Sequence, residues 1–242
     1  SAVFAWAVFE DVVVADNEAG GDGGGIYMSE DGSSYLNVAV TGNEAGGNGG
    51  GVYMDWSAVG GYENVVLDDN VAATGHGGGL YLLPCQPQGP NLRITGHEST
   101  AGWGGGVYTT STQSLALANL VIAGNRAQYG GGLCTWDVTA TALVNAVIAH
   151  NSAVNDGGGI YGGYTSVPMN YSNVAENTPD DFGGSQADPS WYGGNMTVDP
   201  QFADTTPAAT WDWDLHLITG SACVDAGDPA ILDPDGSAAD IG

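Results

Sequence analysis

The sequence contains no lysine, and Arg93 and Arg126 are its only arginines among 242 residues. Against them stand 28 acidic residues, which give a formal net charge of −26. A surface of this charge repels nucleic acid, anionic membranes and uronic-acid polysaccharides, and it attracts divalent cations. Salt bridges cannot hold such a fold together, because almost every carboxylate lacks a cationic partner.

Long apolar runs are also missing. The chain has no stretch of ~18 or more apolar residues, so we expect no membrane span. Its first residues lack the basic segment of a secretory signal peptide, so we expect a mature or trimmed product. Cysteine is scarce, and the odd set of Cys85, Cys134 and Cys223 cannot be fully paired within one chain.

Glycine is abundant, with 41 residues, and it falls at fixed positions. A block of the form Asn-x-Ala…Gly-Gly-Gly-aliphatic-Tyr recurs along the chain. Its leading residues, 26 to 28 positions apart, are Asn17, Asn43, Asn70, His97, Asn125, Asn151 and Asn177. A second column lies six residues earlier, at Asp11, Asn37, Asn64, Asn91, Asn119, Asn145 and Tyr171. This regularity indicates stacked repeats.

The segments after the second column alternate with period two, which predicts strands. Their first and third positions are apolar in every repeat, as at Val38 and Val40, and should point inward. One repeat cannot bury its own apolar face, but stacked repeats can. We therefore predict an all-β, single-stranded right-handed parallel β-helix of about seven rungs. Residues 1–177 form its repeat region, and residues 178–242 add C-terminal rungs and an irregular cap that continue the solenoid.

Stacking places like residues over like at ~4.8 Å. Asn amides can then bond from rung to rung, as in other stacked β structures. Asn also tolerates the positive φ of a tight corner. We expect both columns to be structural ladders, with His97 in a structural role as well.

The repeats resemble those of bacterial surface proteins with right-handed β-helices, including polymorphic outer-membrane passenger repeats. The tail is more specific. Asp199-Pro-Gln-Phe202, Asp214-Leu-His-Leu217, the segment 220–229 and the segment 233–242 resemble the C-terminal module of the choice-of-anchor Q family. The two resemblances cover nearly the whole chain. They imply a secreted, surface-associated β-helix that in the family continues toward an anchor, and they leave its biochemical activity open.

Two surface columns are candidate binding sites. Alternation directs one stripe of tyrosines outward, and it consists of Tyr27, Tyr53, Tyr81, Tyr108 and Tyr161. Stacked aromatics in a row can bind sugar faces or a partner protein, although a covering loop would hide them. The second column is apolar on a face that should point outward, at Val66, Val121 and Val147. It indicates contact with another surface, or only the β-propensity of valine.

The tail also carries closely spaced carboxylates at Asp228, Asp233, Asp235 and Asp240. Such a cluster around a glycine turn can supply the oxygen ligands that calcium needs. The alternative is a solvated acidic turn, since the full twelve-residue calcium loop is absent.

No convincing catalytic set is visible. A uronate lyase needs a basic residue and charge neutralisation, which two arginines supply poorly. A glycosidase acting on a neutral polysaccharide would use paired carboxylates, and Asp68 with Asp69 is the first pair to consider. We expect instead a non-enzymatic extracellular structural or adhesive protein. In one form of this hypothesis, it is a self-assembling subunit of a cell-surface fibre. The alternative is a carbohydrate-binding module that uses the tyrosine stripe. The expected partners are further copies, end to end or side by side, or cell-surface glycans, and not nucleic acid.

Overall fold

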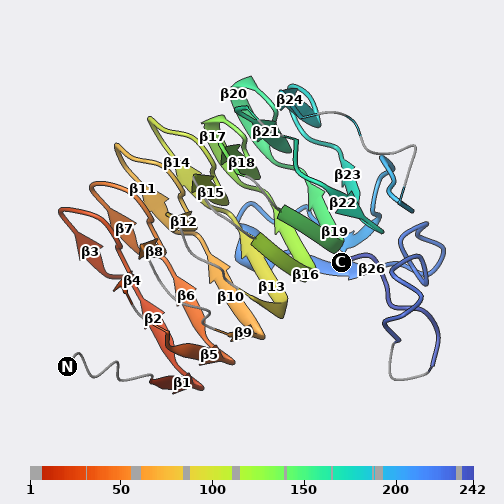
Figure 1. Ribbon diagram of the computed structural model, residues 1–242, viewed down its shortest axis with the longest axis horizontal. Coiled ribbons are helices and arrows are strands. Elements are labelled where there is room, and N and C mark those ends of the chain that lie inside the picture. Colours follow the sequence, from red (N-terminus) through yellow and green to blue (C-terminus); the bar gives the residue numbers. More distant parts are fainter. Residues whose placement is uncertain are drawn as a thin grey trace.

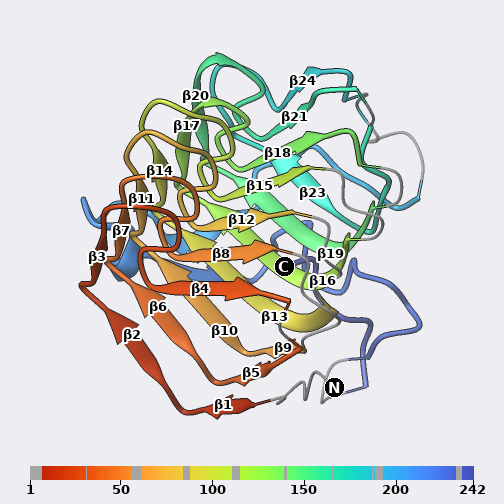
Figure 2. The same cartoon turned by 60° about the vertical axis from the view of Figure 1, so that its left-hand side comes forward.

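The computed structural model describes residues 7–30, 32–55, 61–83, 88–110, 115–138, 141–164, 166–186, 188, 193–232 and 236–242. It confirms the predicted fold class: the chain is a parallel β-solenoid of about six turns (Figures 1 and 2). None of the described residues belongs to an apolar helix of membrane-spanning length.

The longest sheet, called here the long sheet, runs the length of the solenoid. Its eight strands are β2 (Val13–Ala15), β6 (Ala39–Thr41), β10 (Val65–Asp68), β13 (Gln88–Thr95), β16 (Leu115–Ala123), β19 (Thr141–Ala149), β22 (Met169–Asn170) and β23 (Asn173–Ala175). All pairs are parallel and in the register of the repeat: Val66 lies beside Ala39 on one side and Arg93 on the other.

Three further parallel sheets complete the rungs. The first contains β1 (Val8–Glu10), β5 (Ser34–Leu36) and β9 (Tyr62–Glu63). The second contains β3 (Glu18–Ala19), β7 (Glu44–Ala45), β11 (Val71–Ala72), β14 (Glu98–Ser99), β17 (Arg126–Tyr129) and β20 (Ser152–Asp156). The third contains β4 (Ile26–Ser29), β8 (Val52–Asp55), β12 (Leu80–Leu82), β15 (Val107–Thr110), β18 (Leu133–Trp136), β21 (Ile160–Gly162) and β24 (Phe182–Gly184).

The inward columns form one dry core, as predicted. The first position after each corner is at most 4% exposed at Val38, Val65, Leu92, Leu120 and Ala146. The third position is at most 2% exposed at Val40, Leu67, Ile94, Ile122 and Ile148. Buried Tyr35 and Tyr62 belong to this core and stack at 5.5 Å, and the exposed ring of Phe9 stacks on Tyr35 at 5.1 Å.

The outer Asn column is a ladder. Each side-chain amide donates to the preceding rung, from Asn37 to Asp11 at 3.0 Å through to Asn145 to Asn119 at 3.1 Å. Every member has the expected positive φ, between 52° and 61° for Asp11 and the five asparagines. At the next rung Tyr171 has no amide to offer, and the backbone N–H of Asp228 donates to Asn145 Oδ1 instead at 2.7 Å. The tail thus terminates this ladder.

The inner column is a second ladder, and it is buried. Asn43 Oδ1 accepts from both the backbone N–H and the amide of Asn17, and the pattern repeats at Asn70, Asn151 and Asn177. From Asn43 onward each amide also donates to a carbonyl of the preceding rung, as Asn70 does to Val40 at 2.9 Å. His97 takes an Asn position: its Nδ1 accepts from Asn70 N at 2.9 Å, and its own N–H donates to Asn125. Its structural role is confirmed.

After the last rungs the chain turns back. β25 (Phe202–Asp204) and β26 (Asp214–Leu217) form an antiparallel hairpin around a short 3₁₀ helix, η1 (Thr210–Asp212). In Figures 1 and 2 this blue segment lies behind the long sheet. It reaches Asp69, which is 141 residues earlier in sequence than Thr210. The tail therefore packs along the side of the solenoid as well as near its end.

Candidate functional site

The tyrosine stripe points away from the core, as alternation predicts, but the expected exposure is wrong for most of it. Tyr27 is 56% exposed, whereas Tyr53, Tyr81 and Tyr108 are 7%, 9% and 6% exposed. These four rings stack at centroid distances of 4.9, 5.1 and 5.3 Å. The covering side chains are Leu83, Trp103 and Trp136, with half-buried Tyr161 packed beside them. Bulky residues outside the strict repeat thus turn an outward column into a second apolar core.

Burial also governs the chemistry of this column. Desolvation, aided by the nearby Asp55 carboxylate, raises the pKa of Tyr53 to about 12. Cys134 replaces tyrosine in the next rung and is a free, fully buried thiol whose pKa burial raises. The column is therefore a neutral packing element at physiological pH.

The valine column points outward, and at Val147 its partner is the tail of the same chain. Val66 and Val121 are half-buried, and Val147 is fully buried, in keeping with the expected contact. Val147 packs against Cys223 and Ile241. The contact that its apolar character indicated is thus intramolecular.

Between the tail and the long sheet lies a cleft of about 350 Å³, called here the tail cleft. The long sheet contributes Arg93 and Val121 to it. The tail contributes Phe202, the segment 213–217 and the segment 240–242. It combines an arginine, two carboxylates, a histidine and two aromatic rings, and among the described residues it is the candidate site with the most varied chemistry.

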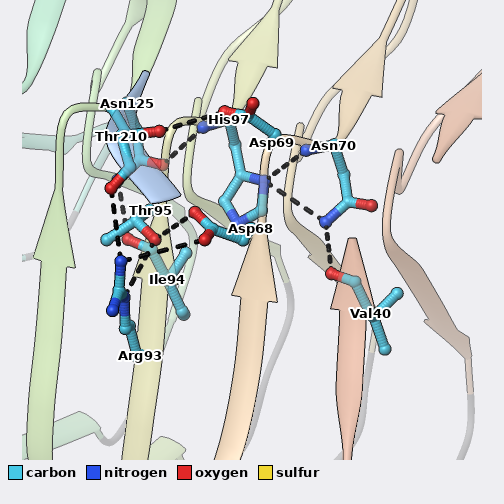
Figure 3. A network of polar contacts seen from close by, with 10 residues as sticks. All are labelled: Val40, Asp68, Asp69, Asn70, Arg93, Ile94, Thr95, His97, Asn125 and Thr210. Atoms are coloured by element: carbon cyan, nitrogen blue, oxygen red, sulfur yellow. Dashed lines mark hydrogen bonds and ion pairs between the residues drawn. The ribbon is translucent and has the colours of Figure 1, made fainter. Parts of the chain in front are cut away.

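A polar network borders this cleft and ties the tail to the sheet (Figure 3). Arg93 donates through Nε to Thr95 Oγ1 at 3.2 Å and through Nη2 to the carbonyl of Thr210 at 3.2 Å. Its Nη2 lies 3.8 Å from Asp68 Oδ2, and the other carboxylate oxygen, Asp68 Oδ1, accepts from the Thr95 hydroxyl. The hydroxyl of Thr210 donates to Asp69 at 3.0 Å. Arg93 and Asp69 thus hold one turn of the tail directly, and Asp68 and Thr95 are the rung partners of Arg93.

The carboxylates of this network carry perturbed pKa values. Burial raises the pKa of Asp68, opposed by the Thr95 hydrogen bond and by the charge of Arg93. Burial likewise raises the pKa of Asp69, opposed by the bond from Thr210. Of the two candidate catalytic acids, Asp69 therefore bonds the tail directly, and Asp68, only 6% exposed, is paired with Thr95 and Arg93.

The tail side of the cleft is acidic and solvated. Asp214 Oδ1 lies 2.6 Å from His216 Nδ1, and this contact lowers the pKa of Asp214. Asp240 accepts from the backbone N–H of Asp225 at 2.8 Å through one oxygen. Its second oxygen is not used by a described contact.

The calcium prediction concerns a loop that is described only in part. Asp228 accepts from the backbone N–H of Ala230 at 2.9 Å, and Asp240 lies at the tail cleft. Asp233 and Asp235 fall outside the described residues. In the part of the chain that the structure describes, no group of three or more His, Cys, Asp or Glu side chains could hold a metal ion. Calcium binding stays a prediction.

A further ladder escaped the sequence reasoning. Asn48 N donates to Asp22, His76 N donates to Asn48, and Trp103 N donates to His76 Nδ1, at 2.6 to 3.0 Å. These four residues each stand five positions before a stacked tyrosine, which is the signal that would have revealed them. Trp213 and Phe202 were also missed, because the tail carries no repeat by which they could be aligned.

Comparison with known proteins adds no relative. No family model, curated protein or solved structure matches this chain.

Proposed function

We propose that this protein is an extracellular structural and adhesive β-solenoid of a cell surface, and not an enzyme. The observation that carries the proposal is the use of its polar side chains. Two ladders of side-chain amides join the rungs, Asp69 and Arg93 bond to the tail, and Asp68 is paired with Arg93 and Thr95. The side chains best suited to acid–base chemistry thus serve the fold. The acidic surface and the resemblance of repeats and tail to bacterial surface proteins support export.

Self-association is part of the proposal. Among the described residues, strands β1 to β4 each pair on one side only, and Val8, Val13 and Tyr27 on them are 69%, 69% and 56% exposed. Unpaired strand edges with apolar side chains bind further strands readily. A second copy that continues the parallel stack is the occupant we favour for this edge.

Beads coated with the purified chain test adhesion, and sedimentation velocity with electron microscopy tests self-association. We expect beads to adhere to cells or to one another, and Val13→Lys to reduce self-association. A matched assay measures reducing ends released from neutral polysaccharides. Release that is abolished in an Asp68→Asn, Asp69→Asn double variant would overturn the proposal in favour of a glycosidase. Absence of both adhesion and self-association would overturn it as well.

A further inference from the structure

We propose that the tail cleft binds a neutral saccharide unit and is the adhesive site of the protein. This inference rests on the proposed adhesive function and gives it a location and a ligand class. It replaces the tyrosine stripe, whose central rings are buried.

The size of the cleft suits a small ligand. A volume of about 350 Å³ lies at the lower end of the range for small-molecule sites. One or two sugar rings fit this class of cavity, whereas an extended polymer would have to present one unit at a time.

The charges of the cleft favour a neutral ligand. Arg93 is its only cation among the described lining residues, and Asp68 lies 3.8 Å from its guanidinium. Asp214 and Asp240 add two carboxylates on the opposite wall. A uronate or phosphate would meet an excess of negative charge there and on the whole molecule.

The free hydrogen-bonding groups match hydroxyls. Arg93 uses Nε and Nη2 for Thr95 and Thr210, and its Nη1 has no partner among the described residues. The second oxygen of Asp240 and the exposed carboxylate of Asp214 are acceptors. A sugar hydroxyl both donates and accepts, so it can use the two walls together.

An aromatic ring is held ready beside these groups. The indole of Trp213 donates through Nε1 to the carbonyl of Pro207 at 2.9 Å, and its ring lies edge-on to His150 at 6.1 Å. The Phe202 ring also packs against His150, at a centroid distance of 6.0 Å. Apolar sugar faces stack on rings that are fixed in this way, at little cost in side-chain entropy.

The rungs leave room for the tail where it approaches. In each rung the residue before the inner-ladder position has a positive φ. In the two rungs against which the tail packs, this residue is a glycine, Gly96 in one and Gly124 in the next. A Cβ on Gly124 would stand 3.0 Å from Trp213 Cη2, and one on Gly96 would collide with Thr210 Oγ1. Two neighbouring rungs thus have glycine where the tail requires it. In the rungs on either side Asp69 and His150 occupy this corner.

A glycan array of neutral and uronic-acid oligosaccharides, followed by calorimetry with the strongest neutral ligand, tests the proposal. We expect binding of neutral saccharides only. Trp213→Ala should raise the Kd about tenfold or more. Trp213→Phe, which keeps an aromatic ring, should have a Kd within about threefold of the parent value. Tyr164→Ala is the matched control, since this ring is 68% exposed and outside the cleft; it should bind like the parent.

Two further variants guard against a folding artefact. Gly124→Asn tolerates the positive φ but displaces Trp213, so binding should fall although the rungs stay intact. Gly42→Asn, at the same corner of an earlier rung, should leave binding unchanged. Preference for uronates, no neutral ligand at millimolar concentration, or equal affinity in Trp213→Ala and the parent would each overturn the cleft proposal. Beads of Trp213→Ala that still adhere would refute the cleft alone, whereas parent beads that never adhere would refute the adhesive function.

Discussion

Replacing His97 by Asn isolates the one member of the inner ladder that lacks an amide. Its Nδ1 accepts from Asn70, but its buried Nε2 has no hydrogen-bond partner among the described residues, although it lies near the carbonyl of Leu67. In the neighbouring rungs the amides of Asn70 and Asn125 reach the equivalent carbonyls at 2.9 and 3.1 Å. Asn at position 97 should restore this bond, worth about 1 kcal/mol, and lose some packing of the ring. At neutral pH the two effects nearly cancel.

The large effect appears in acid. Burial lowers the pKa of His97 to about 3, from 6.5 for an exposed histidine. Between these values the unfolded chain binds a proton that the folded chain does not. The stability contributed by neutral His97 is therefore complete above pH 6.5 and is lost as the pH falls toward 3. The loss is about 1.4 kcal/mol per pH unit, or about 2 kcal/mol by pH 5.

Guanidinium unfolding followed by tryptophan fluorescence, from about pH 7.5 to about pH 5, measures this loss. The raised pKa values of Asp68 and Asp69 change the free energy of unfolding in the opposite direction, but they do so equally in the parent and in His97→Asn. The difference in unfolding free energy between the two chains therefore reports His97 alone. We expect that difference to be flat above pH 6.5 and to grow by about 2 kcal/mol at pH 5 in favour of the variant. His216→Asn is the control, because its side chain is 92% exposed, and it should follow the parent. Parallel curves for the parent and His97→Asn would refute the reasoning.

Three other results are expected. Asn70→Ala removes the acceptor of the buried backbone N–H of Asn43 and the donor to the carbonyl of Val40, and it should cost about 3 kcal/mol, whereas Asn64→Ala in the exposed outer ladder should cost about 1 kcal/mol; equal losses in denaturant midpoint would contradict the ranking. The Cys134 thiol is fully buried with a raised pKa, so a thiol reagent should modify it only after unfolding, and rapid labelling of the folded chain would count against the buried column. If the loop at 228–240 binds calcium, the ion should raise the melting temperature of the protein by several degrees, and Asp240→Asn should abolish this rise. Equal melting temperatures in calcium and in chelator would show the calcium prediction to be wrong.

The rungs were predictable because stacking makes the repeat visible. Every inner Asn has the same surroundings in its rung, so the spacing along the sequence was enough to recognise a column such as Asn43 and Asn70. The hydrogen bonds of the inner and outer ladders could then be predicted from the stacking of these columns. Even the positive φ of Asn37 was expected from residue type. Regular position in the sequence here means regular position in space.

Exposure was harder to predict than direction. Alternation correctly directs Tyr53 and Tyr81 out of the core, but it cannot say what lies above them. The cover comes from Leu83, Trp103 and Trp136, and the residue type at such positions changes between rungs: His76 stands where Trp103 does, and Thr110 where Trp136 does. Burial depends on these irregular residues, and a periodic pattern carries no information about them.

The tail shows the same limit at a larger scale. The bond between Asp69 and Thr210 joins positions 141 residues apart, and no column or period relates them. What the sequence did show was an apolar outward column at Val66, Val121 and Val147, which indicates that something covers that face. In the folded chain the tail itself covers Val147, and it stops short of closing over Arg93 and Val121. A repeat protein that must bind a particular ligand needs such an irregular element, because identical rungs offer every ligand the same surface many times over.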